Sequence, residues 1–391
     1  MVGGGQGAFI GAIHRMAANL DGNIELVCGA FSSHPDKSIV SGAELNIDEN
    51  RCYRNYHDMF QSEATLPAHQ RMQAVIIVTP NNLHFPVAKM AMEYGFHVIS
   101  DKPATFNLAE AIELESIINK TNQLYALTHT YTGYPLIKQA RELIKDGRLG
   151  KIKKVLVEYH QGWLVDKASE KSKQASWRLD PEQSGISCCM GDIGVHAANL
   201  AEYILSSEIT DICAELNSTV SGRLLDDDGI VLLKFANQAK GHLSASQICA
   251  GEENNLRIRV YGETASLDWS QQEPNSLWLR SNTKPTQQIR TAVGNMMPFT
   301  LPAIRTPAGH PEGYIEAFAN IYKNFVQQVI AYENGSISNS IESNLFYDVP
   351  GIKEAISGMA FIESVVSASK SELKWHNINT LSSRKLNDAR K

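Results

Sequence analysis

The sequence has no apolar run of about 18 residues, which is the length that a membrane-spanning helix requires. It also has no excess of basic residues, because 36 Lys and Arg stand against 42 Asp and Glu, a formal net charge of −6. Proteins that bind nucleic acid normally carry a basic face. The first residues lack the basic and apolar regions of a signal peptide. We therefore expect a cytoplasmic protein that has neither a membrane nor a nucleic acid as its partner.

Cysteine is scarce: the six cysteines are scattered and form no C-x-x-C pair. This usage is typical of a reducing compartment and not of a disulfide framework. The remaining composition, 43% apolar and 20% charged residues, is ordinary for a folded protein. At about 150 residues per domain, 391 residues predict two or three domains, each with a core of useful size.

The first third of the chain alternates short apolar segments with segments of helical periodicity. We predict strands over 24–31, 74–79, 97–100 and 124–129, and helices over 11–19, 85–94 and 108–119. Such alternation is typical of βαβ units with right-handed crossovers. The predicted fold class of this part is α/β, with a doubly wound parallel sheet.

Helices become rare after residue 150. We predict strands over 155–160, 212–220, 230–235, 241–248, 256–261 and 265–269, separated by turn residues, which favours an antiparallel sheet. A helix is expected over 192–205, a loop rich in Pro, Gly and Thr over 282–311, and two long helices over 314–332 and 351–369. We place the boundary between the two parts near residue 130.

Five glycines crowd the start of the first helix, and Gly3 and Gly5 fit the pattern G-x-G-x-x-G with Ala8 at its third position. Glycine permits a tight turn from strand to helix and lets backbone N–H groups approach a pyrophosphate. The pattern predicts dinucleotide binding, with a flexible N-terminal arm as the alternative. Only Met1 and Val2 precede the glycines, so either the chain begins inside the first strand or a few residues precede it.

The acidic residue that usually binds the ribose 2′-hydroxyl is missing, since Ser32 and Ser33 follow the strand predicted over 24–31. Two hydroxyls would not repel a 2′-phosphate, and Lys37 is placed to pair with one. A solvated surface lysine is the alternative explanation for Lys37. The expected cofactor is thus NAD or NADP, with a slight lean toward NADP.

Three polar motifs are candidates for catalysis. T-P-N-N-L-H at 79–84 and the Asp101-Lys102-Pro103 turn each follow a predicted strand, and ligands of a doubly wound sheet bind beyond the carboxyl ends of its strands. Asp192 and His196 are four residues apart on a predicted helix and therefore share a face. Lysine suits the orientation of a substrate hydroxyl, and histidine suits the transfer of its proton. Each motif alone also has a structural explanation, and no third ligand stands at zinc spacing, so we expect no metal.

Together these residues resemble the glucose–fructose oxidoreductase / inositol dehydrogenase (Gfo/Idh/MocA) family. The resemblance rests on the glycine-rich start, T-P-N-N-L-H, D-K-P, G-D-I-G-V-H-A-A-N-L and V-Y-G-E-T-A-S-L at 260–267, and it extends from residue 2 to about residue 369. It implies a Rossmann domain over 1–130 and a substrate-binding and oligomerisation domain over 131–375, followed by a polar tail over 376–391. The second domain would be α+β with an open, mostly antiparallel sheet, and the family commonly forms homodimers or homotetramers through the open face of that sheet.

The resemblance also implies roles for single residues. Lys102 would lie beside the nicotinamide and the reacting carbinol, and His196 would be the acid/base, paired with Asp192. The expected cofactor-binding residues are Gly3, Gly5, Gln6, Gly7, Phe9, Ile10, Ser32, Ser33, Lys37, Thr79, Pro80, Asn81, His84, Asp101 and Lys102. The candidate substrate contacts are Tyr131, Trp163, Trp177, Arg178 and His310.

The predicted activity is hydride transfer between the nicotinamide of NAD or NADP and a carbinol of a sugar, a cyclic polyol or a related compound. Two alternatives stay open. One is an NAD-dependent glycosidase that uses transient oxidation, and the other is a non-catalytic dinucleotide-binding protein. The natural substrate and the direction of the reaction are not readable from the sequence.

Overall fold

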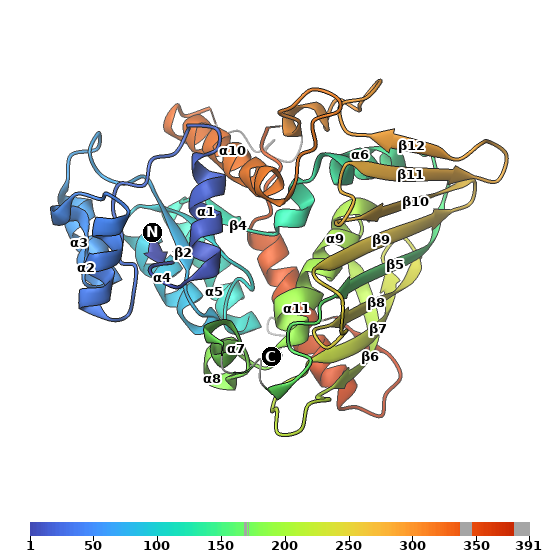
Figure 1. Ribbon diagram of the computed structural model, residues 1–391, viewed down its shortest axis with the longest axis horizontal. Helices are drawn as coiled ribbons and strands as arrows, with labels where there is room; N and C mark the ends of the chain where they lie inside the picture. The colour runs from blue at the N-terminus through green and yellow to red at the C-terminus, as the bar shows by residue number, and fades with distance from the viewer. Residues whose placement is uncertain (168–169, 171, 337–345, 379–391) are drawn as a thin grey trace. The chain divides into compact units, whose positions relative to one another are not determined.

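The computed structural model describes residues 1–167, 170, 172–336 and 346–378 (Figure 1). Contacts divide the chain into two compact units. The first unit comprises Met1–His129 with Phe318–Ala355, and the second comprises Thr130–Ala317 with the described residues from Ile356 onward. The sequence suggests a single boundary near residue 130 and contains no signal that 318–355 belong to the first unit.

The first unit contains a parallel sheet, as the alternation of strands and helices predicts. In its described residues four strands pair in the order β1-β2-β3-β4, and every pair is parallel. The strands are β1 Val2–Gly3, β2 Ala74–Val78, β3 His97–Ser100 and β4 Tyr125–Leu127, and the helices are α1 Phe9–Asn19, α2 Pro35–Glu44, α3 Tyr56–Thr65, α4 His84–Glu93 and α5 Leu108–Thr121. The alternate side chains Val75 and Ile77 of β2 are fully buried in the core. The predicted Rossmann fold is confirmed.

The prediction of a strand over 24–31 is wrong for most of these residues. Only Gly29 and Ala30 form isolated parallel bridges, to Cys52 and Val2, and residues 23–28 have no regular structure. A strand needs a neighbour along its length, and β1 pairs with this segment only at Val2. The apolar run here reflects burial, since Cys28 is 2% exposed, and not strand pairing.

The second unit is built on a mostly antiparallel sheet, which confirms the predicted α+β architecture. In the described part of this unit nine strands lie in the order β12-β11-β10-β9-β5-β8-β7-β6-β13, and only β5 and β8 pair in parallel among them. The strands are β5 Ile152–His160, β6 Ile209–Asn217, β7 Asp228–Phe235, β8 Lys240–Ser246, β9 Asn255–Gly262, β10 Ala265–Ser270, β11 Ser276–Ser281, β12 Gln287–Arg290 and β13 His376–Asn377.

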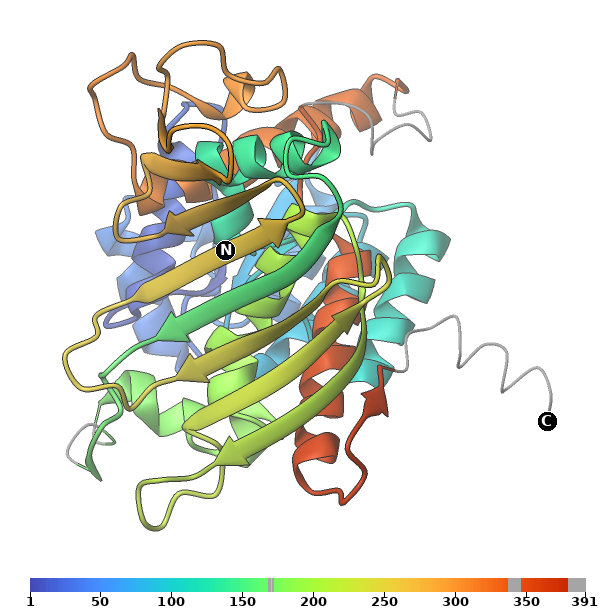
Figure 2. The same cartoon turned by 90° about the vertical axis from the view of Figure 1, so that its right-hand side faces the viewer.

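Helices cover one face of this sheet and leave the other face open (Figure 2). Helix α6 (Pro135–Lys145) packs on β10 and β11, and α9 (Val195–Leu205) packs on β5 and β8. The other helices of this unit are α7 Lys173–Arg178, α8 Pro181–Ser184 and most of α11 Ile352–Ser369, whereas α10 Tyr314–Glu333 lies mostly in the first unit. The open face presents Ile230, Leu232, Tyr261 and Trp278, each at least 37% exposed.

Three features of the second unit differ from the sequence prediction. Strands β11 and β12 were not predicted, and β12 lies inside the segment expected to be a loop. Its sequence, Gln-Gln-Ile-Arg, is that of a polar edge strand, which has little hydrophobic periodicity. The helix expected over 192–205 begins with a π-helical turn, Met190–Gly194, before α9.

The described residues contain neither a candidate membrane span nor a candidate metal cluster. No helix there is long and apolar enough to cross a membrane. No group of three or more His, Cys, Asp or Glu side chains there is arranged to hold a metal ion.

Candidate functional site

The glycine-rich turn connects β1 to α1 through left-handed backbone. Gly3, Gly4 and Gly7 have φ values of +80°, +74° and +72°, which favour glycine. A Cβ on Gly11 would overlap the backbone of Gly4, so these two glycines allow the turn to pack against α1. A Cβ on Gly5 would lie 2.7 Å from the Phe31 carbonyl oxygen. All five glycines belong to the crowded start noted in the sequence, although only Gly3, Gly5 and Gly7 were predicted to bind the cofactor.

This turn borders a pocket of about 430 Å³ at the N-terminus of α1. The N-cap residue Ala8 supplies no side-chain hydrogen bond, and the first turn of α1 carries no acidic residue. Uncapped N–H groups and the helix dipole make such an N-terminus suitable for an anion. The arrangement therefore fits the pyrophosphate of a dinucleotide. The pocket is lined by Gly4, Gly5, Gln6, Gly7, Ala8, Phe9, Ala12, Arg15, Ser41, Glu44 and Leu45.

The other expected residues of this region take different places. The backbone N–H of Gln6 donates to Ser41 Oγ at 3.1 Å, and the side-chain amide of Gln6 donates to Glu44. Ile10 is expected at the cofactor but packs in a small apolar cluster with Met1 and Phe31.

The segment after Phe31 leads into α2, which begins at Pro35. Ser32 Oγ accepts the backbone N–H of His34 at 3.2 Å, so this hydroxyl orders the turn, and Ser33 is exposed. Lys37 is exposed in the first turn of α2. The arrangement leaves Lys37 accessible to a ligand and does not by itself select NAD or NADP.

The lysine motif forms a tight turn after β3. Asp101 Oδ1 accepts the backbone N–H of Lys102 at 2.8 Å and the hydroxyl of Thr128, just beyond β4, at 3.0 Å. The Lys102–Pro103 peptide bond is cis. One carboxylate oxygen thus ties the turn that carries Lys102 to the neighbouring strand end.

His84, at the start of α4, joins the T-P-N-N-L-H segment to this turn. Its Nδ1 lies 2.7 Å from the Pro103 carbonyl oxygen and its Nε2 lies 2.9 Å from that of Thr79. Burial lowers the pKa of His84, and the two carbonyl contacts act in the opposite direction. Thr79 Oγ1 is buried and has no hydrogen-bond partner among the described residues. Thr79 therefore offers a hydroxyl to a ligand at the carboxyl end of β2, and Pro80 and Asn81 follow it directly.

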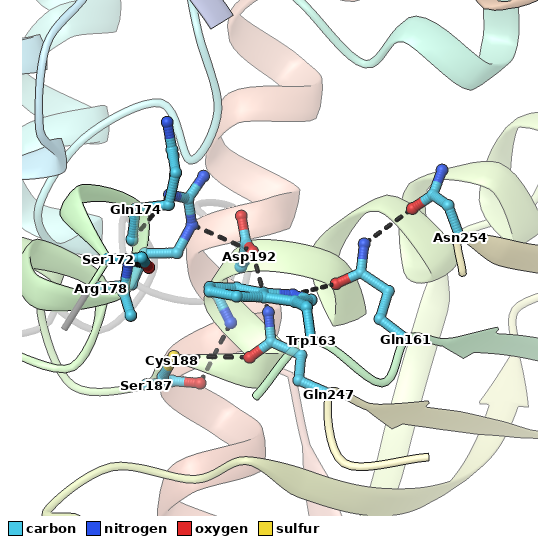
Figure 3. Close-up of polar contacts among 12 residues, drawn as sticks. Gln161, Trp163, Ser172, Gln174, Arg178, Ser187, Cys188, Asp192, Gln247 and Asn254 are labelled. Carbon is cyan, nitrogen blue, oxygen red and sulfur yellow. Dashed lines mark hydrogen bonds and ion pairs between the residues drawn. The ribbon is translucent and has the colours of Figure 1, made fainter. Parts of the chain in front are cut away.

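Asp192 lies in the π-helical turn of the second unit and has two partners of its own (Figure 3). Its Oδ2 lies 3.1 Å from Arg178 Nε in α7 and accepts the Gln247 amide at 2.9 Å. Gln247 was not predicted, because it lies just beyond the end of β8 and 55 positions away in the sequence. These contacts hold the carboxylate of Asp192 in one orientation.

Asp226 holds the backbone of the same turn. Its Oδ1 accepts the Cys188 N–H at 3.0 Å, and its Oδ2 accepts the Met190 N–H and the Ser187 hydroxyl, both at 2.9 Å. Burial raises the pKa of Asp226, while these three hydrogen bonds act against that rise. Asp226 is thus a further residue that the sequence analysis missed.

His196 lies in α9 and is 8% exposed. The ring of Tyr131 contacts it edge to face, with 4.9 Å between ring centroids. The Tyr131 hydroxyl forms a short hydrogen bond with the Tyr159 hydroxyl, which donates to Asn254 Oδ1 at 2.8 Å. The Gln161 amide donates to the same oxygen at 2.7 Å and accepts the indole N–H of Trp163 at 2.8 Å (Figure 3). Tyr131 and Trp163, both expected to contact substrate, therefore belong to one hydrogen-bonded network.

The other expected substrate residues lie in different places. Arg178 joins Asp192, and its guanidinium carbon lies 4.3 Å from the centroid of the Trp177 ring. His310 lies on an exposed loop, where its Nδ1 is 3.3 Å from the Pro307 carbonyl oxygen. No contact among the described residues joins His310 to Asp192 or His196. The grouping of Lys102, in the first unit, with Asp192 and His196, in the second, stays a prediction.

Both units match models of known protein families. Residues 1–129 match the oxidoreductase family with an NAD-binding Rossmann fold, and residues 137–268 match the GFO/IDH/MocA C-terminal domain. The chain is 32% identical over 379 residues to YfiI, an uncharacterised oxidoreductase of Bacillus subtilis, covering 96% of this chain and 95% of that protein. It is 26% identical over 324 residues to levoglucosan dehydrogenase of Pseudarthrobacter phenanthrenivorans, covering 75% and 80% of the two chains.

A solved structure shows the same fold over nearly the whole chain. An inositol dehydrogenase homologue of Azotobacter vinelandii in complex with NAD⁺ superposes with a TM-score of 0.91 at 34% identity, covering 96% of each chain. A second crystal structure of that homologue contains NADH and myo-inositol. These complexes contain NAD⁺ or NADH, so they give the expected lean toward NADP no support. The chain is an NAD(P)-dependent oxidoreductase that belongs to the Gfo/Idh/MocA family.

Proposed function

We propose that this protein is a dehydrogenase that transfers a hydride between a nicotinamide cofactor and a carbinol of a sugar or cyclic polyol. The observation that carries the proposal is the position of Lys102. It follows β3 in a parallel sheet whose β1–α1 turn fits a pyrophosphate, and ligands of such sheets bind beyond the carboxyl ends of the strands. The Azotobacter relative, which binds NADH and myo-inositol, supports the same substrate class.

The first unit would hold the cofactor. The glycine turn and the N-terminus of α1 bind the pyrophosphate, and Ser32 with Lys37 faces the adenosine ribose. Thr79, Pro80, Asn81 and Lys102, at the two later strand ends, would bind the nicotinamide side. The predicted cofactor residues His84 and Asp101 would instead hold these two segments in place. When bound, the nicotinamide accepts or returns the hydride. The protein's own task is to fix the substrate and to manage the hydroxyl proton.

The proton step would belong to His196 and Lys102. The ammonium group of Lys102 orients the substrate hydroxyl and favours negative charge on its oxygen, and His196 accepts the proton. Asp192, held by Arg178 and Gln247, carries negative charge close to His196 in the sequence. Its role is to orient the proton acceptor.

The substrate contacts would come from the network around Trp163. An indole face suits the apolar face of a sugar or inositol ring, and amide groups suit its hydroxyls. Gln161 and Asn254 supply such amides, and Tyr131 links them to His196. Arg178 adds a donor beside Asp192.

Turnover with myo-inositol and a panel of sugars and cyclic polyols, followed by NADH or NADPH absorbance, tests this proposal. Lys102→Met should lower kcat by about 10²- to 10³-fold, the usual effect of removing one group that stabilises developing charge. The dissociation constant for NADH should stay within about threefold, because the glycine turn is untouched. Lys89→Met is the matched control, since Lys89 is an exposed lysine paired with Glu113.

Two results would contradict the proposal. One is full activity of Lys102→Met, which would remove the lysine from the chemistry. The other is a wild-type protein that binds neither NADH nor NADPH, because the cofactor site then does not form.

A further inference from the structure

Behind the lysine turn, the first unit contains a line of buried polar side chains that the proposed chemistry does not use. His14 of α1 is fully buried, and Tyr322 of α10 is 1% exposed. His14 Nδ1 lies 2.6 Å from the Tyr322 hydroxyl, and its Nε2 lies 3.9 Å from Asp101 Oδ2. The other oxygen of Asp101 binds the backbone N–H of Lys102. Three contacts thus lead from Tyr322 to Lys102.

The hydrogen-bonding pattern indicates which ring nitrogen of His14 carries the proton. Nε2 faces the Asp101 carboxylate, which can only accept, so Nδ1 is the nitrogen left to accept from the Tyr322 hydroxyl, whose pKa burial raises. The proton of a neutral imidazole is then on Nε2. Nε2 has no hydrogen-bond partner among the described residues, and the nearest acceptor that it faces is the Asp101 carboxylate. A buried donor without a partner is costly, so this N–H belongs with Asp101.

The environment keeps Asp101 ionised. Burial alone would raise the pKa of Asp101, but the facing His14, together with Lys102 and His84, holds it well below its usual range. An ionised carboxylate accepts hydrogen bonds with both oxygens, and Asp101 uses one for the lysine turn and presents the other to His14. The groups that face Asp101 are His14 from α1, His84 from α4, Tyr125 from β4, and Lys102 and His129 from the turns after β3 and β4.

We propose that His14, fixed by Tyr322, is a positioning residue that acts through Asp101 to hold the turn carrying Lys102. The proposal deepens the proposed function, since it concerns the same lysine. His14 lies on the helix whose N-terminus borders the pyrophosphate pocket. One helix would therefore bind the cofactor at its start and, at His14, support the residue that works beside the nicotinamide.

The test compares His14→Leu, His14→Gln and Tyr322→Phe with the wild-type protein. His14→Leu removes the donor that faces Asp101, whereas His14→Gln keeps an amide donor of similar reach. Tyr322→Phe releases the ring without removing it. Tyr332→Phe is the matched control, because Tyr332 lies on the same helix and packs on His97 instead.

Hydrogen–deuterium exchange of the peptide spanning Ser100–Phe106 reports on the turn without requiring activity. We expect His14→Leu to exchange about tenfold faster there, as follows from weakening one buried hydrogen bond to a charged acceptor. His14→Gln should exchange at nearly the wild-type rate, and Tyr322→Phe should lie between the two. Unchanged exchange in His14→Leu, or an equal increase in Tyr332→Phe, would overturn the proposal.

The activity readouts separate positioning from general damage to the fold. In His14→Leu, kcat should fall about tenfold or more while the dissociation constant for NADH stays within about threefold. If the wild-type protein turns over no polyol or sugar, the proposed function fails, whereas the exchange experiment still decides the role of His14.

Discussion

Asp226→Asn tests how the second unit holds the turn that carries Asp192. Asp226 is 8% exposed, and its two oxygens accept different backbone N–H groups, those of Cys188 and Met190. An asparagine has the same shape but only one acceptor oxygen. Whichever way the amide is oriented, one of the two N–H groups faces an NH₂ group. The variant therefore loses at least one buried hydrogen bond and leaves a buried donor unpaired.

The expected loss of stability follows from these contacts. A hydrogen bond to a charged group contributes about 1.5–3 kcal/mol, and an unpaired buried donor costs about 1–3 kcal/mol. Removing a buried charge offsets part of this, because burial raises the pKa of Asp226. We expect the free energy of unfolding to fall by about 2 kcal/mol at pH 7. The turn carrying Asp192 should also loosen, which would lower kcat about tenfold.

The pH dependence of this loss has a definite sign. The native pKa of Asp226 is raised above its ordinary value of 3.8, so on acidification the native state binds this proton before the unfolded state does. The wild-type protein thereby gains stability from this group as the pH falls through the native pKa toward about 4. Asparagine does not titrate in this range. The stability deficit of Asp226→Asn should therefore grow between pH 7 and pH 4.

Urea unfolding followed by circular dichroism measures the deficit, and kcat with the best substrate measures its effect on the site. Asp228→Asn is the matched control in the same aspartate triplet, because Asp228 is only partly buried and accepts an Asn217 amide at 3.3 Å. We expect it to change the unfolding free energy by less than about 0.5 kcal/mol. A deficit below that size for Asp226→Asn, or equal deficits for both variants, would refute the reasoning.

Three further predictions concern the cofactor and the open sheet face. Gly11→Ala places a Cβ against the backbone of Gly4, so the dissociation constant for NADH in a fluorescence titration should rise about tenfold; unchanged affinity would show that the turn adapts. Lys37→Ala should weaken NADPH about fivefold in calorimetry and leave NADH unchanged, and equal effects on both would exclude a 2′-phosphate contact. Trp278→Asp puts a charge on the open sheet face and should convert the expected homodimer or homotetramer to smaller species in sedimentation velocity; an unchanged sedimentation coefficient would place the interface elsewhere.

Strand β2 was predictable from the sequence, whereas β11, β12 and the isolated pairing at 29–30 were not. The β-branched run of β2 is buried between β1 and β3, so its composition and its structure agree. The run over 24–31 is also mostly apolar but forms only two isolated bridges. Hydrophobic periodicity records which side chains are buried, whereas a strand also requires a partner for its backbone, and that partner is distant in sequence.

Candidate residues were predictable where the chemistry is local to a motif. The Asp101-Lys102-Pro103 turn and its place after β3 follow from a short apolar run and one proline. The helical spacing of Asp192 and His196 was also visible, but the π-helical turn at Met190–Gly194 was not. That turn depends on Asp226, which is 36 positions from Met190 in the sequence. A local pattern cannot report a backbone geometry that a distant carboxylate holds in place.

The aspartate triplet at 226–228 shows why such residues escape a reading of the sequence. Three consecutive carboxylates at the start of β7 look like a solvated turn, yet Asp227 is fully buried. It accepts hydrogen bonds from Arg223 and from the backbone and hydroxyl of Thr219. A buried carboxylate is tolerated only when donors satisfy it, and these donors must come from the segments that it joins. Asp226 thus fixes the backbone of the turn carrying Asp192, and Asp227 fixes the segment at 219–223, so each buried carboxylate holds a different neighbouring segment in one shape.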